Sequence, residues 1–179
     1  MSIMDFMDQA VLNFFVANRV EWLSFLMLII TYSGSYILAG GLTILSFLSF
    51  FIHKHKSSAI SLLISVGGSL TSVFILKNIL QKARPLTEAL YLESSSSFPS
   101  GHATIAMALY GFILYTLWKH DKHHLKNPLI IFLAILIPLI GLSRLYLGVH
   151  YLSDVLVGYI IGFIWVVISL YIKKKLNRR

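Results

Sequence analysis

Cysteine is absent from the sequence and charged residues are scarce, and each shortage excludes a class of protein. Without cysteine the chain forms no disulfide and offers no thiolate to a metal ion, so cysteine usage does not indicate a redox compartment. Only 12% of the 179 residues are charged, whereas 57% are hydrophobic and the mean hydropathy is +0.79. A soluble domain of this length needs a far more polar surface. The composition therefore indicates a membrane protein.

Long apolar runs recur along the chain, and each can cross a bilayer as a helix. They predict spans at about 34–53, 57–80, 101–118, 128–147 and 152–172. The first thirty residues are apolar overall but carry polar side chains, namely Asp5, Asp8, Asn18, Arg19 and Glu21. They fit a short span ending near Asn18 followed by an interfacial or re-entrant helix over 22–31, and they fit one broken span equally well.

These runs predict an all-α, polytopic fold in which residues 1–179 form one integral-membrane domain. The N-terminal stretch MSIMDFMDQ has neither a basic region nor a cleavage site, so we do not expect a cleaved signal peptide. Gly158 and Gly162 form a pair of small residues four positions apart, which predicts a close contact between two helices.

The basic residues indicate the orientation in the membrane. Ten of the fifteen lysines and arginines lie at junctions that alternating spans place on one side: Lys54, Lys56, Lys119, Lys122, Lys126, Lys173, Lys174, Lys175, Arg178 and Arg179. That side, with the C-terminus, is predicted to be cytoplasmic. The N-terminus is then cytoplasmic with six spans and outside with five. The net charge of +8 reflects this topology and contact with anionic lipid head groups, not binding of nucleic acid.

The remaining five basic residues are predicted at or near the opposite face: Arg19, Lys77, Lys82, Arg84 and Arg144. His102 and His150 also belong to this face, whereas the other histidines lie in the cytoplasmic junctions. Arg19 and Lys82 are interpreted as anchors whose charged ends reach the membrane surface. The presence of the other three cations needs a different explanation, because charged side chains are unfavourable on a surface that faces lipid.

The stretch KNILQKARP, residues 77–85, carries two of these cations. If the 57–82 helix continues to Arg84, Lys77 and Arg84 are nearly two full turns apart and project from the same stripe. Lys82 is then rotated away from them, and Pro85 ends the helix.

The stretch FPSGHATIAMAL, residues 98–109, opens an apolar helix with polar residues. Ser100 is a favourable N-cap, so the helix is expected to start at about Gly101 with free backbone N–H groups. Such a helix end attracts anions, and Gly101 has no side chain to hold a ligand away. His102, in the first turn, is expected to stand beside the bound anion.

The stretch SRLYLGVHYLSD, residues 143–154, also carries polar and charged residues between apolar segments. Arg144 ends one span, and His150 and Asp154 are four residues apart, so on the next helix they are expected to hydrogen-bond. An aspartate in an apolar stretch is costly unless it is paired. Asp154 would accept the proton of one ring nitrogen of His150 and leave the other nitrogen as a nucleophile.

Together these features suit phosphoryl transfer. Three cations match the equatorial oxygens of a phosphoryl group, one histidine can attack phosphorus, and the other can protonate the leaving group. No carboxylate cluster suits magnesium and no third ligand suits zinc, so neither metal nor cofactor is expected. The residues predict metal-independent hydrolysis of a phosphoester through a phosphohistidine.

The three stretches resemble the signature motifs of the type 2 phosphatidic acid phosphatase family: K-x6-RP, PSGH and SR-x5-H-x3-D. Every defining position is matched in order and spacing between Lys77 and Asp154. The resemblance implies a bundle of six transmembrane helices with the active site at the outer membrane face. The first of these spans is weak in this sequence. It implies that His150 is the nucleophile, that Asp154 orients it and that His102 is the general acid. The phosphate ligands that it implies are Lys77, Arg84, Ser100, Gly101 and Arg144.

The expected activity is removal of the terminal phosphate from a lipid phosphate or pyrophosphate. Candidate substrates are phosphatidylglycerophosphate, undecaprenyl pyrophosphate, phosphatidate and diacylglycerol pyrophosphate. Two alternatives remain: a non-enzymatic transporter of anions or lipid phosphates, which would not need a His–Asp pair, and a lipid phosphotransferase. The expected partners are the lipid substrate and membrane lipids, with no nucleic acid and no obligate protein partner. The expected location is the plasma membrane, with the site on the extracytoplasmic side.

Overall fold

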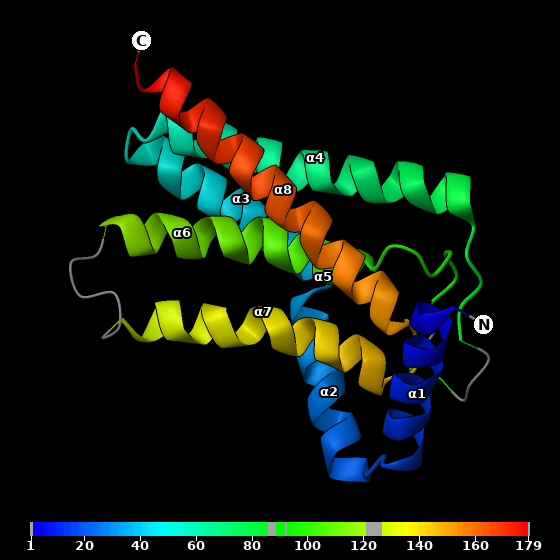
Figure 1. Ribbon diagram of the computed structural model, residues 1–179. Coiled ribbons are helices and arrows are strands. Elements are labelled where there is room, and N and C mark those ends of the chain that lie inside the picture. The colour runs from blue at the N-terminus through cyan, green and yellow to red at the C-terminus, as the bar shows by residue number, and fades with distance from the viewer. Residues whose placement is uncertain (1, 86–88, 92, 121–126, 179) are drawn as a thin grey trace.

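The computed structural model describes residues 2–85, 89–91, 93–120 and 127–178, and all the regular secondary structure in these ranges is helical. The helices are α1 (Ile3–Ala17), α2 (Glu21–Ser33), α3 (Tyr36–Ile52), α4 (Lys56–Leu80), α5 (Gly101–Ile105), the π-helical turn η1 (Ala106–Tyr110), α6 (Gly111–His120), α7 (Pro128–Tyr146) and α8 (Leu152–Leu176) (Figure 1). The all-α prediction is therefore confirmed for the described residues.

Four helical segments are long and apolar enough to cross a membrane, namely α4, the continuous helix Gly101–Lys119, α7 and α8. Helices α2 and α3, bent by 44° at their junction, add a fifth if the pair is one span. The five predicted apolar runs match these helices and α3 closely. In the first thirty residues two helices form, with a break after Ala17, which is compatible with both predicted paths. The sixth span stays a prediction, because α1 has 15 residues and is not among the candidate spans.

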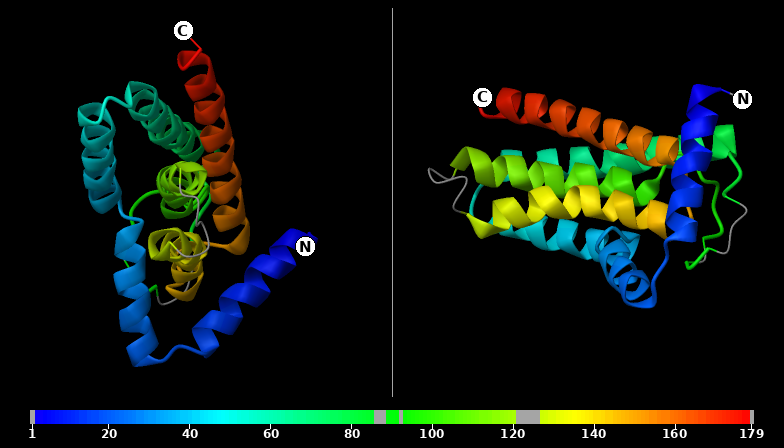
Figure 2. Two further views of the ribbon diagram at one scale, coloured as in Figure 1. Left: turned by 90° about the vertical axis from the view of Figure 1, so that its left-hand side faces the viewer. Right: turned by 60° about the horizontal axis from the view of Figure 1, so that its bottom comes forward.

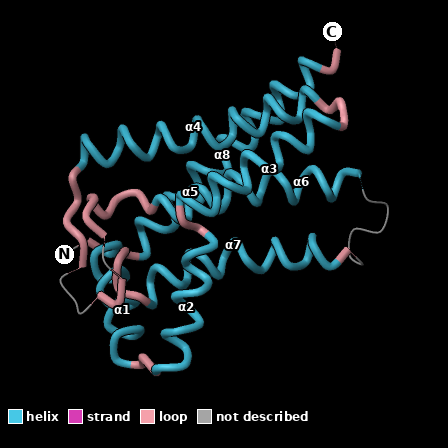
Figure 3. The backbone as a smooth tube through the Cα atoms, turned by 180° about the vertical axis from the view of Figure 1, so that it is seen from behind, coloured by secondary structure: helices cyan, strands magenta, loops and turns pink. Residues whose placement is uncertain are grey.

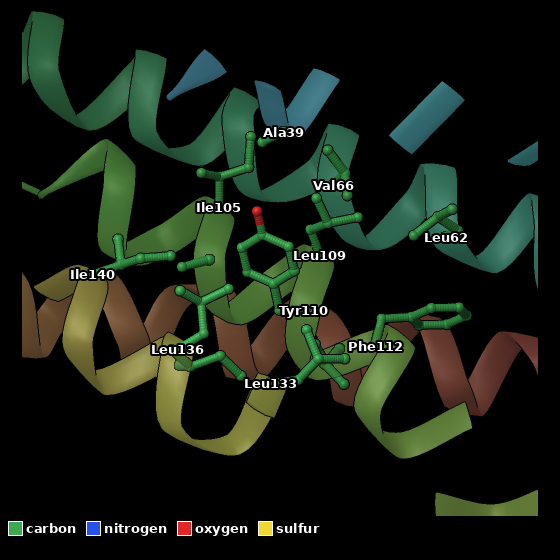
Figure 4. Packing of buried hydrophobic residues seen from close by; sticks show 13 residues of the cluster. Ala39, Leu62, Val66, Ile105, Leu109, Tyr110, Phe112, Leu133, Leu136 and Ile140 are labelled. Atoms are coloured by element: carbon green, nitrogen blue, oxygen red, sulfur yellow. The ribbon is translucent and has the colours of Figure 1, made fainter. Parts of the chain in front are cut away.

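The core lies where α3, α4, α7 and α8 surround the α5–η1–α6 helix. Leu62 of α4, Leu109 of η1 and Ile140 of α7 are fully buried in one apolar cluster (Figure 4). The Tyr110 hydroxyl donates a hydrogen bond to the Ser33 carbonyl at 2.5 Å, which ties this core to the end of α2. The α5–η1–α6 helix is therefore the central element of the bundle.

Close packing of α8 on α5 sets the position of the site. A Cβ atom at Gly158 would lie 2.8 Å from the Ser100 carbonyl oxygen, and one at Gly162 would lie 2.6 Å from that of Thr104. Only glycine allows the two helices to approach this far, as the small-residue pair predicts. The contact brings the first turn of α8 to the start of α5, where the Ser100 N–H donates to the Asp154 carbonyl at 3.0 Å.

The two ends of the bundle differ in chemistry. The α3–α4 turn, the end of α6 and the C-terminal end of α8 lie at one end (Figure 1), and α8 carries Lys173, Lys174 and Lys175 in its last turn. At the other end α1 lies across α7 and α8 (Figure 2). The described parts of the connection between α4 and α5 lie beside α1 at that end (Figure 3). The candidate site forms there.

Candidate active site

Lys77 and Arg84 meet through a loop and not along a helix, which corrects the sequence prediction. Helix α4 ends before Gln81, because that residue adopts the left-handed conformation (φ 43°, ψ 35°). Its N–H still bonds to the Lys77 carbonyl. Beyond it, Arg84 Nε donates to the Ser95 carbonyl at 2.7 Å, and Lys77 Nζ donates to the neighbouring carbonyl of Ser96. The residues before the PSGH motif thus bring the two cations together.

The interpretation of Lys82 as a surface anchor is wrong. Its Nζ donates to Asp154 Oδ1 at 2.8 Å and to Ser153 Oγ at 3.0 Å, and it lies 4.5 Å from the centre of the Tyr151 ring. The prediction assumed that a helix continues through Lys82 and rotates its side chain away from the site. Helix α4 has already ended at Leu80, so this assumption does not hold. The sequence did carry one signal, since a buried Asp154 requires a cation or several donors.

Helix α5 begins at Gly101, as predicted, but the N-cap works differently. Ser100 occupies the N-cap position without a hydrogen bond from its side chain, and its Oγ is buried with no hydrogen-bond partner in the structure. A side chain at Gly101 would meet the hydroxyl of Tyr36, which would have to move to make room for it. This leaves the Ser100 hydroxyl available to a ligand.

His102 lies buried in the first turn of α5 between two aromatic rings. The ring centres of Tyr36 and Tyr91 lie 6.1 and 6.3 Å from that of the imidazole. Its Nδ1 is 3.7 Å from Glu93 Oε1, and its buried Nε2 has no hydrogen-bond partner in the structure. His102 therefore has one ring nitrogen near a carboxylate, and its other ring nitrogen is available to a ligand.

Glu93 is a site residue that the sequence did not reveal. Its Oε1 accepts a hydrogen bond from Arg144 at 2.6 Å, and its Oε2 accepts one from Arg84 at 3.3 Å. Arg144 is fully buried and also donates to Thr31 Oγ1 at 2.6 Å, so α2 contributes to the site. An anionic group thus lies where two guanidinium groups and His102 converge, which is the place predicted for the phosphate. Glu93 follows no spacing rule relative to the three motifs.

The pairing of His150 with Asp154 also differs from the prediction. Helix α8 starts at Leu152, so His150 lies before the helix and not one turn along it. His150 Nδ1 is 3.6 Å from Asp154 Oδ2, which is longer than a hydrogen bond. The hydroxyl of Ser97, another residue that sequence reasoning missed, donates to Asp154 Oδ2 at 2.5 Å and lies 3.3 Å from His150 Nδ1. Ser97 thus bridges the pair.

The contacts of His150 define which nitrogen can react. Arg84 Nη1 lies 3.3 Å from His150 Nε2, and a guanidinium can only donate, so Nε2 must be the acceptor. The neutral ring then carries its proton on Nδ1, which faces Ser97 and Asp154. Burial lowers the pKa of His150 to about 3, so the imidazole is neutral at neutral pH. Its Nε2 lone pair faces the cations.

The structure brings all eight predicted site residues into one connected cluster, namely Lys77, Arg84, Ser100, Gly101, His102, Arg144, His150 and Asp154. The buried atoms Ser100 Oγ, His102 Nε2 and Arg144 Nε have no hydrogen-bond partner in the structure, which is typical of groups that bind a ligand. Among the described residues, no group of three or more histidine, aspartate and glutamate side chains is placed to hold a metal ion.

Comparisons with known proteins give consistent matches. The sequence model of the PAP2 superfamily matches residues 58–178. Phosphatidylglycerophosphatase B of Bacillus subtilis (strain 168) is 33% identical over 161 residues, which cover 88% of this chain and 78% of that protein. The crystal structure of the first transmembrane PAP2-type phosphatidylglycerolphosphate phosphatase from Bacillus subtilis superposes with a TM-score of 0.88 at 30% identity, covering 98% of this chain and 88% of that one. The crystal structure of Aquifex aeolicus LpxE superposes with a TM-score of 0.76 at 28% identity, covering 96% of this chain and 99% of that one. With its apolar helices, the chain is thus a multi-pass membrane protein.

Proposed function

Because this chain belongs to the PAP2 superfamily, we propose that it is a lipid phosphatase that removes the terminal phosphate of a membrane lipid phosphate or pyrophosphate. The observation that carries the proposal is the convergence of Arg84 and Arg144 on one carboxylate, Glu93. His102 lies 3.7 Å from this carboxylate, and His150 lies 3.3 Å from Arg84. Two guanidinium groups suit the oxygens of a phosphoryl group, and the histidines suit its transfer.

The proposed reaction has two steps. Phosphate oxygens replace the Glu93 carboxylate at the guanidinium groups, and His150 Nε2 attacks phosphorus. The N–P bond forms as the bond from phosphorus to the lipid oxygen breaks, and protonated His102 gives its proton to that oxygen. Water then attacks the phosphorus of the phosphohistidine while His102 takes one of its protons. The N–P bond breaks, and inorganic phosphate leaves with three oxygens from the substrate and one from water. Asp154 orients His150 in both steps.

The proposal places the site at the extracytoplasmic face, with a cytoplasmic C-terminus and a weak first span over α1. It is supported by the position of the site, which lies at the end of the bundle away from the α3–α4 turn and the basic end of α8 (Figure 1). By the positive-inside rule that basic end belongs to the cytoplasm.

An apolar groove beside the site favours a lipid over a soluble phosphate ester. It has a volume of about 500 Å³ and runs from Tyr91 along α3, past Ile37, Leu38 and Leu45. The Tyr91 ring packs against His102 and lies 4.9 Å from the Arg144 guanidinium, so the groove begins at the phosphate position. We propose that the tail of the substrate lies in this groove while its head group reaches the cations.

Purified protein in detergent is expected to release inorganic phosphate from at least one of four lipids: phosphatidylglycerophosphate, phosphatidate, diacylglycerol pyrophosphate and undecaprenyl pyrophosphate. A chelator such as EDTA should leave the rate unchanged, because the site neutralises phosphate with arginine and lysine. The assay measures free phosphate with and without EDTA. Absence of release from every lipid would contradict the proposed activity, and loss with EDTA that magnesium restores would contradict metal independence.

Filling the groove should discriminate against long lipid tails. A Cβ atom at Gly41, which lines the groove, meets nothing within 4 Å in the protein, so Gly41→Leu is the substitution chosen to fill the groove. We expect KM for a long-chain substrate to rise about tenfold, while KM for a short-chain analogue stays unchanged. Gly40→Leu is the matched control, because its added Cβ is equally unhindered and Gly40 is not among the lining residues. Equal KM values in the two variants would show that the tail lies elsewhere.

A further inference from the structure

Helix α1 carries a buried carboxylate that the proposed reaction does not use. Asp8 is only 6% exposed, and both of its oxygens are engaged by the first turn of α8. Oδ1 accepts a hydrogen bond from the Ser153 N–H at 2.8 Å, and Oδ2 accepts one from the Ser153 hydroxyl at 2.6 Å. Asp8 thus satisfies one of the free N–H groups at the start of α8 from a different helix.

Lys82 connects this carboxylate to the one beside His150. Its Nζ lies 2.8 Å from Asp154 Oδ1 and 3.5 Å from Asp8 Oδ2. The Ser153 hydroxyl lies between them, 3.0 Å from the same ammonium. One lysine therefore serves two carboxylates, and its position depends on both.

Every described contact of the Asp154 carboxylate sets its orientation. Lys82 holds Oδ1, while Oδ2 accepts hydrogen bonds from the Ser97 hydroxyl at 2.5 Å and from the Tyr151 N–H at 3.0 Å. The side chain is fully buried, so it has no solvent to compensate for a lost donor. If Lys82 moves, Oδ1 loses its donor, and the carboxylate is held only by the two hydrogen bonds to Oδ2.

We propose that Asp8 and Lys82 are positioning residues for the reaction. Asp8 fixes the Lys82 ammonium, and Lys82 fixes the Asp154 carboxylate so that it holds the Nδ1–H tautomer of His150. Helix α1 is thereby part of the active site and not merely a membrane anchor. The inference rests on the proposed function for its effect on turnover, but the geometry that it predicts at His150 is independent of the substrate.

The test uses Asp8→Asn, which keeps the size of the side chain and removes its charge. The matched control is Asp5→Asn on the same helix, since Asp5 is exposed and caps α1 through Ser2. With an active lipid substrate, Asp8→Asn should lower kcat about tenfold at unchanged KM, because orientation matters most in the transition state. Asp5→Asn should leave both constants unchanged.

A double-mutant cycle separates positioning from a merely structural role. Lys82→Gln should lower kcat at least as much as Asp8→Asn, and Asp8→Asn added to Lys82→Gln should cost less than about twofold more, because both act through one path. Multiplicative losses would overturn the inference. If Asp8→Asn does not fold, Lys82→Gln alone decides it, since the Lys82 side chain is 35% exposed and tolerates exchange better.

A spectroscopic measurement tests the positioning of His150 independently of whether the protein is a lipid phosphatase. In protein labelled with ¹⁵N-histidine, the His150 ring signals are identified by their loss in His150→Gln. They should shift in Asp8→Asn and Lys82→Gln and stay in place in Asp5→Asn, whether or not any lipid is hydrolysed. Unchanged His150 signals in both Asp8→Asn and Lys82→Gln would overturn the inference even if the wild-type protein is an active phosphatase. Shifted signals without any phosphate release would support it and contradict the proposed function alone.

Discussion

Replacing His150 with glutamine is expected to abolish phosphate release and to prevent formation of a phosphorylated intermediate. Glutamine keeps polarity but has no lone pair on a nitrogen that can attack phosphorus, so covalent displacement has no nucleophile. We expect a loss of about 10⁴-fold or more in kcat. The measurement is phosphate release, combined with acid-labile ³²P labelling of the protein after rapid quenching with a substrate labelled in its terminal phosphate.

The control for this experiment is His53→Gln. His53 is exposed at the end of α3, away from the cluster, and its ring bonds to the Ser49 carbonyl. It should retain wild-type release and labelling. If His150→Gln still became labelled, the phosphoryl group would have to reside on another residue, and the assignment of the nucleophile would be wrong. Substrate binding without release in the wild-type protein would instead favour a transporter.

The second large effect is expected for His102→Gln, and it should depend on the leaving group. An alkoxide leaves poorly without a proton, so loss of the general acid should lower kcat about 10³-fold on a lipid monophosphate, whose leaving group is an alkoxide. An aryl phosphate such as p-nitrophenyl phosphate releases a stable anion that needs no proton. The same variant should therefore lose less than about tenfold on the aryl ester. The measurement is the ratio of the two losses.

This ratio distinguishes acid catalysis from phosphate binding. His150→Gln serves as the comparison, because loss of the nucleophile must affect both substrates alike. If His102→Gln lowered the two rates equally, His102 would act by holding the phosphate, as its position near Glu93 also permits. Full activity of His102→Gln on the lipid would show that His102 takes no part in the reaction.

Most of the helical architecture could be predicted because hydropathy and helix length are local properties. An apolar run of about 20 residues has few alternatives to a membrane span, and the bilayer sets its length. The predicted runs at 57–80 and 128–147 coincide with α4 and α7 within one residue. The N-terminal region was not predictable to this degree, because Asp8, Asn18 and Arg19 break the apolar pattern there.

The site residues could be predicted for a different reason. Lys77, Arg84, His102, His150 and Asp154 are costly at a membrane face, so their presence alone indicates function. Asp8 offered the same signal, since it interrupts an apolar helix. Its partners on α8 are more than a hundred residues away in the chain, and no spacing pattern connects them.

The sequence by itself determined the class of protein, the position of its spans and the polar groups gathered at one end of the bundle. Tertiary structure decided how those groups meet. The left-handed Gln81 ends α4 and turns Lys82 toward Asp154, so a residue expected at the surface pairs with a buried carboxylate. The loop before α5 places Glu93 between two arginines. Both outcomes depend on loops, whose paths follow from long-range hydrogen bonds and not from local periodicity.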